Sequence, residues 1–418
     1  MKILLVEPEF PIPPKSKNHR NFLPIGLLKL ASYYRKQGER IKLVRGNKSK
    51  EDIRSYRGGR WWVPDKIMIT SLFTYWAKYV RDSVRHYKNL YPEAKVVVGG
   101  VYASLMPEHC KEYTKCDEVF VGVHEGAEKS FPAYDLIENN PHPLDYQIVR
   151  TSRGCTRSCE FCGVSKIESS FKVKNSMKKE IKYRKIVFYD DNLLANPCIE
   201  DILNELIELK NDKKILWCEA QSGFDGRILK EKPPLATMIK KAGFHYPRIA
   251  WDSRYEQHNE IKDQLNVLLG AGYKSKEIFV FMLYNWDIPF EEMEKKRLKC
   301  WEWQVQIADC RFRPLDCTYD KYIPYIPLKR QDAKDYYIHP DWIDAEVKQF
   351  RKNVRRQNIC VRHSFPFYSE DLRQKRVKED IIRAIKRMKT VEERVRCLEK
   401  NGIECWIPDK VTYPSEAG

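Results

Sequence analysis

The chain has 418 residues, with 76 Lys and Arg against 58 Asp and Glu and a formal net charge of +18. Its length allows two or three domains with full-sized hydrophobic cores. The apolar run at residues 3–6 is too short for a signal peptide, and no apolar run approaches the length of a membrane span. We therefore expect a cytoplasmic protein without membrane contacts, in which the 13 cysteines stay largely reduced.

Residues 1–140 alternate between short apolar runs and amphipathic segments. Gly26 to Lys36 has apolar residues at helical spacing and is closed by Gly38. The apolar runs predict strands at residues 3–6, 41–44, 67–70, 96–98 and 118–121. Such alternation indicates an α/β domain with a doubly wound parallel sheet, which binds ligands at the carboxyl ends of its strands.

Small residues close two neighbouring strands of this predicted sheet. Ser71 and Leu72 end one strand, and Gly99 and Gly100 end the next. This pattern resembles the cobalamin-binding domain, and the resemblance implies that all four residues contact cobalamin, since glycine admits a close approach of the nucleotide tail. The D-x-H-x-x-G motif of many members is absent, although His19 lies in the corresponding loop. A domain that keeps this Rossmann-like fold but binds no corrin is the alternative.

The cysteine loop is the segment Thr151–Gly163, which holds Cys155, Cys159 and Cys162 in a C-x3-C-x2-C spacing. Three thiolates on one short loop can ligate three irons of a 4Fe-4S cluster and leave the fourth iron open. A structural zinc site usually needs four protein ligands, commonly in paired C-x2-C turns, and this loop has one such turn. An odd number of scattered cysteines also argues against a disulfide framework.

With Phe161 before its last cysteine, the loop resembles the cluster loop of radical S-adenosylmethionine (SAM) enzymes. The resemblance implies that SAM binds the open iron and that Phe161 lies near this cofactor. It further implies that an electron donor such as flavodoxin or ferredoxin reduces the cluster. Cleavage of SAM would then produce a 5′-deoxyadenosyl radical. Residues 24–31 also resemble the first helix of the cobalamin-type members of this family.

Residues 141–330 contain six strand-like runs, each followed by polar residues. They lie at residues 146–149, 186–189, 215–218, 248–251, 278–283 and 305–308. Polar residues at the carboxyl ends of parallel strands are typical of a barrel with its active face on that side. Six strands suit the partial (βα)6 barrel of radical SAM enzymes.

The polar strand ends supply the candidate SAM and substrate contacts. The segment 189–197 resembles the second-strand signature of the cobalamin-type group, but the Gly-Gly-Glu of other radical SAM enzymes is absent. The SAM amino group therefore needs another carboxylate. Ordinary helix N-caps are the alternative explanation, since Asp and Asn are favoured there. The catalytic candidates are Asp190, Asp191 and Asn285, and the further cofactor-binding candidates are Tyr189, Glu219, Gln221 and Asp252.

Residues 331–418 predict a basic helical region with amphipathic stretches at 342–358 and 369–401, the second read as one helix. Radical SAM enzymes often have a variable segment here that caps the barrel mouth, so the resemblance implies that this region sets substrate choice. Its basic face is either a solvated surface or a docking site for RNA, DNA or an acidic partner.

Three functions remain open from the sequence. The first is a radical SAM enzyme that uses cobalamin to methylate an unactivated carbon. The second is a radical SAM enzyme without cobalamin that rearranges or modifies a nucleotide or nucleic acid. The third is a nucleic-acid-binding protein with a structural iron–sulfur cluster. The substrate is accordingly a small molecule or a nucleic acid.

Overall fold

The computed structural model describes residues 1–12, 19–53, 62–137, 144–321 and 331–414. The chain forms two compact units. The first unit contains Met1–Gln221 and Arg313–Tyr337, and the second contains Ser222–Phe312 and Ile338–Gly418. These units follow spatial packing, so the three segments predicted from the sequence, 1–140, 141–330 and 331–418, stay predictions.

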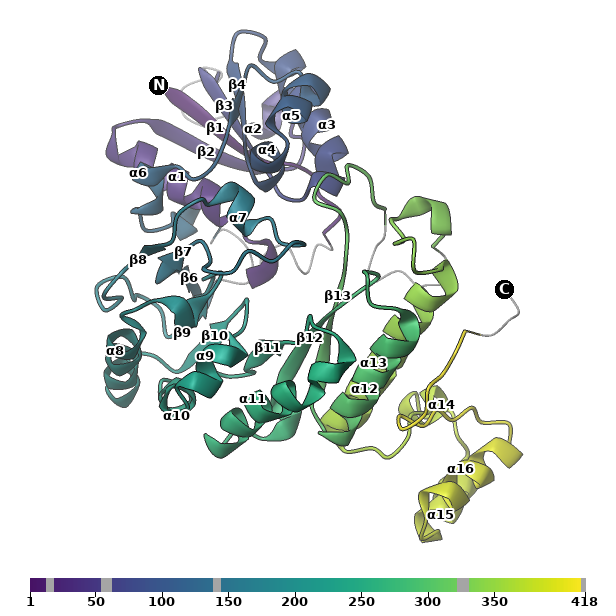
Figure 1. The fold of residues 1–418 in the computed structure, drawn as a ribbon. Helices are drawn as coiled ribbons and strands as arrows, with labels where there is room; N and C mark the ends of the chain where they lie inside the picture. The colour runs from purple at the N-terminus through teal and green to yellow at the C-terminus, as the bar shows by residue number, and fades with distance from the viewer. Residues whose placement is uncertain (13–18, 54–61, 138–143, 322–330, 415–418) are drawn as a thin grey trace. The chain divides into compact units, whose positions relative to one another are not determined.

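The first unit begins with a parallel five-stranded sheet of order β2-β1-β3-β4-β5 (Figure 1). This confirms the predicted doubly wound α/β domain, and the strand order reverses between β1 and β3. The strands are β1 Lys2–Glu7, β2 Arg40–Arg45, β3 Lys66–Ser71, β4 Lys95–Gly100 and β5 Glu118–Phe120. The helices are α1 Ile25–Lys36, α2 Lys50–Ile53, α3 Ala77–Leu90, α4 Val101–Leu105, α5 Pro107–Thr114 and α6 Glu125–Glu128.

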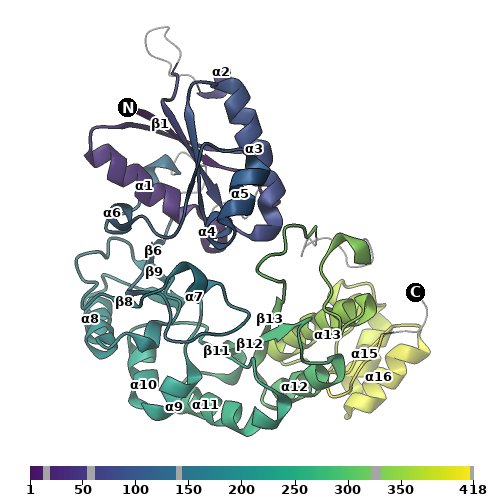
Figure 2. The same cartoon turned by 45° about the horizontal axis from the view of Figure 1, so that its top comes forward.

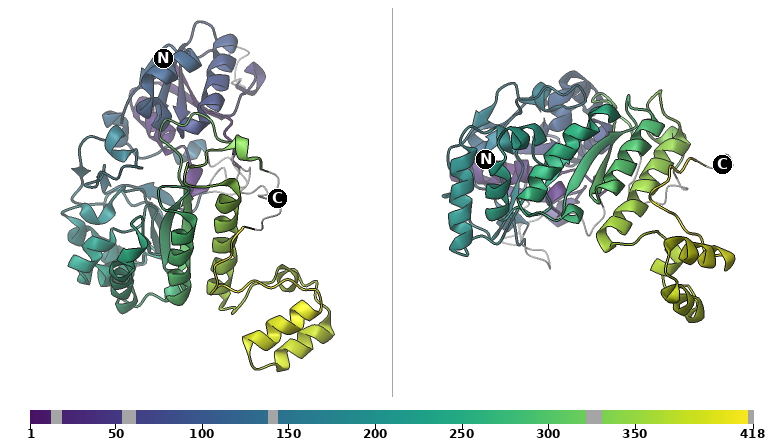
Figure 3. Two further views of the ribbon diagram at one scale, coloured as in Figure 1. Left: turned by 45° about the vertical axis from the view of Figure 1, so that its right-hand side comes forward. Right: turned by 60° about the horizontal axis from the view of Figure 1, so that its bottom comes forward.

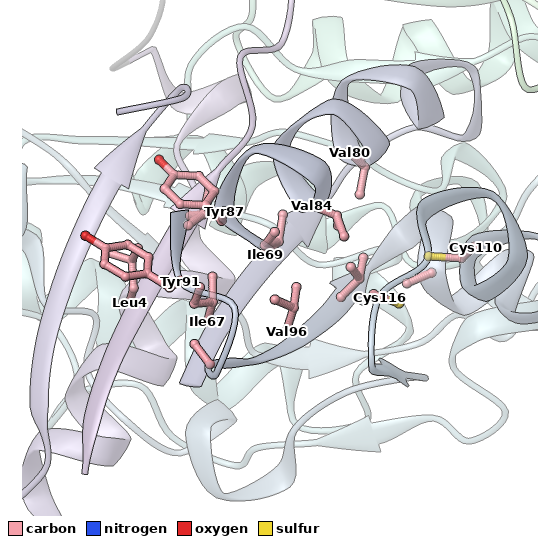
Figure 4. Close-up of a cluster of buried hydrophobic side chains, with 14 of the residues drawn as sticks. Leu4, Ile67, Ile69, Val80, Val84, Tyr87, Tyr91, Val96, Cys110 and Cys116 are labelled. Carbon is pink, nitrogen blue, oxygen red and sulfur yellow. The ribbon is translucent and has the colours of Figure 1, made fainter. Parts of the chain in front are cut away.

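Helix α3 covers one face of this sheet with a row of buried side chains. Val80, Val84 and Tyr87 of α3 lie over Ile67 and Ile69 of β3 (Figure 4). The three central strands β1, β3 and β4 are mostly buried on both faces, which explains why they read as continuous apolar runs in the sequence.

Helix α1 is apolar on two sides and joins two sheets of the first unit. Leu27 and Ala31 pack on Ile3 of the five-stranded sheet. Leu28 instead packs with Val187 of a second sheet. A helix that is apolar on two sides must be buried on both, so α1 ties the second sheet to the first.

The second sheet of this unit is parallel and has the order β10-β9-β6. Its strands are β6 Gln147–Val149, β9 Lys185–Phe188 and β10 Trp217–Ala220. At the start of the cysteine loop, β7 Ser152–Arg153 pairs antiparallel with β8 Lys172–Val173. Helices α7 Val164–Ile167 and α8 Ile199–Asn211 follow the loop and β9. The predicted strand 215–218 was placed two residues too early, and Glu219 therefore lies within β10 and not after it.

The second unit has a parallel sheet of order β11-β12-β13 with helices alongside it (Figure 3). Its strands are β11 Arg248–Ala250, β12 Phe279–Tyr284 and β13 Gln306–Arg311, and its helices are α9 Gly226–Glu231, α10 Pro234–Lys241, α11 His258–Gly270, α12 Phe290–Glu302 and α13 Asp344–His363. All six strands expected for the barrel segment are therefore present, three in each unit. Their closure into one partial (βα)6 barrel stays a prediction.

The predicted single helix over residues 369–401 is wrong. The segment forms α14 Glu370–Arg373, α15 Glu379–Arg387 and α16 Val391–Lys400. A capping box starts α16, because Thr390 Oγ1 accepts the Glu393 N–H at 3.1 Å while the Glu393 carboxylate accepts the Thr390 N–H at 3.2 Å. The apolar face predicted for this region is buried among the short helices themselves.

Short 3-10 helices complete the described secondary structure. They lie at Arg20–Phe22, Thr74–Trp76, Tyr134–Leu136, Leu193–Ala195, Tyr255–Gln257, Ser275–Glu277 and Ala333–Asp335. Within the described ranges, every helix is too short or too polar to cross a membrane.

Candidate functional site

The four predicted cobalamin contacts meet at the carboxyl ends of β3 and β4. Ser71 Oγ donates to the Gly99 carbonyl at 2.9 Å and accepts the Ala103 N–H at 3.0 Å. The Leu72 carbonyl accepts the Tyr102 N–H at 3.0 Å. These bonds attach the start of α4 to both strands, so the buried Ser71 hydroxyl organises the edge of the sheet.

Gly100 is required by the packing of the chain itself. Its φ of 106° and ψ of −165° lie in a region that is essentially restricted to glycine. A Cβ atom at this position would lie 2.2 Å from the Ser71 carbonyl oxygen. At Gly99 the nearest atom to an added Cβ is Phe120 Cβ at 3.6 Å, an ordinary contact. The close approach at Gly100 is thus between two strand ends, whereas the sequence analysis attributed it to a nucleotide tail.

This difference gives a matched pair of variants. We expect Gly100→Ala to destabilise the first unit by about 3 kcal/mol or more, through backbone strain and the clash with Ser71. Gly99→Ala should change stability by less than about 1 kcal/mol, since its Cβ fits. Denaturant unfolding of both variants measures this, and equal losses would contradict the assignment.

Aromatic side chains lie between the carboxyl ends of β1 and β3, and the sequence analysis did not identify them. Phe10 stacks on Trp76 with ring centroids 5.1 Å apart, and Phe73 stacks on Tyr75 at 4.8 Å. The guanidinium carbon of Arg313 is 4.4 Å from the Tyr75 centroid, and Phe73 is 41% exposed. Parallel sheets bind ligands where their strand order reverses, and aromatic faces there suit a large planar ligand.

Arg20, in the 3-10 helix before α1, is attached to the second sheet by an ion pair with a buried glutamate. Arg20 Nη2 is 2.9 Å from Glu219 Oε2, and the Glu219 side chain is fully buried. The Arg20 guanidinium carbon also lies 5.5 Å from the Trp217 ring centroid. Burial and the charge of Arg20 lower the pKa of the neighbouring His19, against an opposing effect of Glu219. Glu219 therefore has a partner within the chain, and its predicted contact with SAM stays a prediction.

The cysteine loop presents three cysteine side chains. Cys159 is exposed, whereas Cys155, Cys162 and Phe161 are half-buried. The Cys162 N–H donates to the Cys159 carbonyl at 3.0 Å, and the Arg157 N–H donates to Cys155 Sγ at 3.3 Å. Such thiol donors and N–H···S bonds fit a thiolate-held iron–sulfur cluster. Among the described residues, however, no three His, Cys, Asp or Glu side chains converge on one point as metal ligands do.

Asp190 holds the start of the cysteine loop. Its Oδ1 accepts the Thr151 and Ser152 N–H groups at 2.9 and 2.6 Å and their hydroxyl groups at 2.5 and 2.8 Å. Burial raises the pKa of Asp190, and the hydrogen bonds from Thr151 and Ser152 oppose that rise. Asn196, which the sequence analysis did not single out, donates to the carbonyls of Thr151 and Lys174 at 3.1 and 3.0 Å. Asp190 thus positions Thr151 and Ser152 within the chain, and its predicted catalytic role stays a prediction.

Asp191 is the more accessible of the two adjacent carboxylates. Its side chain is 19% exposed, and its Oδ2 lies 3.4 Å from Arg150 Nη1. Burial raises the pKa of Asp191, and the charge of Arg150 opposes this effect. The Arg150 guanidinium carbon is 5.9 Å from the Tyr189 ring centroid, and the Gln221 N–H donates to the Phe188 carbonyl at 2.9 Å. These residues follow β6, β9 and β10, so the structure gathers them at one sheet edge.

The end of the cysteine loop packs on helix α4 of the same unit. Helix α7, directly after the loop, contacts α4 (Figures 1 and 2). A Cβ atom at Gly163 would lie 3.4 Å from Leu105 Cδ2 and 3.5 Å from Leu315 Cδ2, so the backbone approaches both side chains closely. Leu105 ends α4, and α4 begins directly after Gly100. The first unit therefore places the cysteine loop beside the carboxyl edge of β3 and β4.

Asp252 follows β11 in the second unit and is supported by a buried lysine. Lys296 Nζ donates to the Trp251 and Ser253 carbonyls at 2.8 and 3.0 Å, on either side of Asp252. Burial lowers the pKa of Lys296 to about 8. Burial likewise raises the pKa of Asp252, against the charge of Lys296. Asp252 is thus held as a half-buried carboxylate after its strand.

Asn285 is buried, and both polar atoms of its side chain form hydrogen bonds. It adopts a left-handed backbone conformation with a φ of 58° at the end of β12. Its Nδ2 donates to the Phe312 carbonyl at 3.2 Å, and its Oδ1 accepts the His339 N–H at 3.0 Å. Asn285 therefore joins the end of β12 to two later segments, and its predicted catalytic role stays a prediction.

A half-buried carboxylate, Glu128, gives a pH dependence that can be measured. Burial alone would raise the pKa of Glu128, but the Arg153 and Lys29 side chains outweigh it and lower the pKa from 4.5 to about 2. Because the folded-state pKa is the lower one, the stabilisation is present above pH 4.5 and is lost as the pH falls towards 2. We expect the free energy of unfolding to fall by about 3 kcal/mol over this pH window. The Glu128→Gln variant should not show this pH-dependent fall. Unfolding curves of both proteins between these pH values test this, and parallel pH profiles would contradict it.

Residues 20–131 match the B12 binding domain family. No curated protein matches the chain. The matched range runs from the segment before α1 through β5 and α6, and it includes the carboxyl ends of β3 and β4. The match supports a cobalamin-binding component in this α/β protein and suggests a cobalamin-dependent function.

Proposed function

We propose that the chain is a cobalamin-dependent radical SAM enzyme that methylates an unactivated carbon. The observation that carries this proposal is the packing of Gly163 and α7 on Leu105 of α4. Helix α4 starts at the sheet edge that lies within the match to the B12 binding domain family. A methyl donor and a radical source must act on the same substrate atom, and adjacent cofactor sites meet this requirement.

The chain offers distinct residues for the two cofactors. The edge formed by β3 and β4, with Phe73 and Tyr75 beside it, would hold the corrin, and Cys155, Cys159 and Cys162 would hold the cluster. When bound, the cluster would supply the electron that cleaves SAM to a 5′-deoxyadenosyl radical, and the corrin would supply a methyl group.

The residues around the cysteine loop divide into positioning and binding roles. Asp190 and Asn196 hold Thr151 and thereby the start of the loop. Asp191, which is partly exposed and weakly paired with Arg150, is the carboxylate that would accept the SAM amino group.

One further residue is a candidate contact for SAM or substrate. Asp252 is the candidate polar contact, with Lys296 fixing the backbone on both sides of it. A small acidic electron-transfer protein such as flavodoxin or ferredoxin would approach the exposed Cys159 and the exposed Lys166 that follows the loop in sequence. Charge complementarity would speed this encounter.

The deciding experiment is a cofactor analysis of protein produced with hydroxocobalamin and purified without oxygen. We expect about one corrin and about four iron atoms per chain, and 5′-deoxyadenosine when SAM and a reductant are added. Substrate methylation is then followed by the transfer of label from methyl-labelled SAM.

Each other result points to a different function. A chain that cleaves SAM but retains no corrin would be a radical SAM enzyme without cobalamin. A chain with bound zinc, or with a salt-sensitive affinity for RNA or DNA and no cleavage of SAM, would contradict the proposal.

A further inference from the structure

Four charged side chains of alternating sign form a half-buried network in the first unit. Lys29 Nζ is 2.7 Å from Glu128 Oε1, and Arg153 Nη2 is 2.8 Å from Glu128 Oε2. Arg153 Nη1 is 2.5 Å from Glu168 Oε1. The four side chains are between 12% and 23% exposed, so solvent screens these interactions less than at the surface.

Arg153 and Glu168 close the cysteine loop at its base. Arg153 lies two residues before Cys155, and Glu168 lies six residues after Cys162. The backbone is also close at this point, since a Cβ atom at Gly154 would lie 2.8 Å from the Ser170 carbonyl oxygen. The guanidinium group of Arg153 therefore spans the two ends of the segment that holds the thiols.

The same guanidinium group connects the closed loop to the region that matches the B12 binding domain family. Glu128 belongs to α6 and Lys29 to α1, both within the matched residues 20–131. Arg153 uses one terminal nitrogen for each carboxylate, a geometry that its planar fork permits and a lysine ammonium does not reproduce.

We propose that Arg153 is a positioning residue that holds the cysteine loop closed through Glu168 and fixes it to the cobalamin-binding component through Glu128. The inference rests on the proposed function for its biological meaning. The loop order itself is a property of the metal-free chain and is measurable without any cofactor.

The test measures the alkylation rates of individual thiols in the metal-free protein by mass spectrometry. In Arg153→Lys and Glu128→Gln we expect Cys155 and Cys162, which are half-buried, to react at least about tenfold faster than in the unmodified chain. Cys218 is fully buried in β10 and serves as the internal reference, with an unchanged rate.

The control variant is Asp117→Asn, at the residue directly before the amino end of β5. Asp117 accepts the Val96 N–H at 2.7 Å before β5 starts, so its loss weakens the same domain without touching the loop. We expect this variant to leave the reactivity of Cys155 and Cys162 unchanged, even where its unfolding midpoint falls.

The outcomes separate the two proposals. Loop thiols that stay within about twofold of the unmodified rates in both network variants would overturn the positioning role. A parallel rise at Cys218 would also overturn it, since that indicates global unfolding. If instead the thiols respond as expected while the unmodified chain takes up no iron, the positioning role of Arg153 stands and the proposed enzyme function fails.

Discussion

Replacing Cys155, Cys159 and Cys162 together by alanine is expected to abolish iron uptake and to lower 5′-deoxyadenosine formation at least about a thousandfold. The physical reason is that the three thiols of one loop are the proposed protein ligands of the cluster. Each single replacement should already cause most of the loss, because residues that act as a unit are not additive. Iron and sulfide content, together with product analysis by mass spectrometry, measures the effect.

Cys397→Ala is the matched control, because Cys397 is a half-buried cysteine of α16 that lies outside the loop. It should leave iron content and SAM cleavage unchanged. If the triple variant still cleaved SAM, the cysteine loop would not hold the reactive centre. If the unmodified chain bound zinc and no iron, and the triple variant lost that zinc, the loop would be a structural metal site.

The second large effect is expected at Asp190. Asp190→Ala removes the acceptor of four hydrogen bonds from Thr151 and Ser152 and leaves these buried donors unpaired. We expect a loss of about 4 kcal/mol in the stability of the first unit. Hydrogen exchange in β6 and β9 should become faster, and the uptake of iron should fall with it.

The neighbouring carboxylate serves as the matched control. Asp191→Asn removes one long ion pair with Arg150 at 3.4 Å, so we expect a stability change below about 1 kcal/mol. The same variant should raise the KM for SAM at least about tenfold, since Asp191 is the proposed acceptor of the SAM amino group. The reverse pattern, with Asp191 needed for stability and Asp190 for SAM binding, would contradict both assignments.

The sequence alone predicted the α/β fold of the N-terminal domain and the five strands of its parallel sheet. Apolar runs such as those of β1, β3 and β4, separated by amphipathic helices and glycines, are local signals that a parallel sheet needs. The break at Thr390 within the predicted C-terminal helix was also encoded locally, in the Thr-x-x-Glu pattern of its capping box. The predicted position of β10 was wrong for a different reason. Glu219 is a charged residue inside the strand, so the apolar run that served as the signal ended before it.

The sequence predicted which polar residues lie at the candidate site, but it did not predict which groups each side chain contacts. Asp190, Glu219 and Asn285 all looked like strand-end polar residues that face a ligand. In the structure each has a partner in the chain: Thr151 and Ser152 for Asp190, Arg20 for Glu219, and Phe312 and His339 for Asn285. A sequence pattern identifies a polar residue at a strand end, but its partner comes from a distant segment.

What the sequence by itself determined is therefore the local chemistry: the spacing of three thiols, the alternation of strands and helices, and the small residues after β3 and β4. Only the tertiary structure decided that α1 packs on two sheets, that Gly100 lies against the Ser71 backbone, and that the cysteine loop packs on α4. The physical reason is that spacing and periodicity act over a few residues. The burial of Leu28, the pairing of Arg153 with Glu128 and the approach of Gly163 to Leu105 instead join segments far apart in the chain, which meet only when the unit has folded.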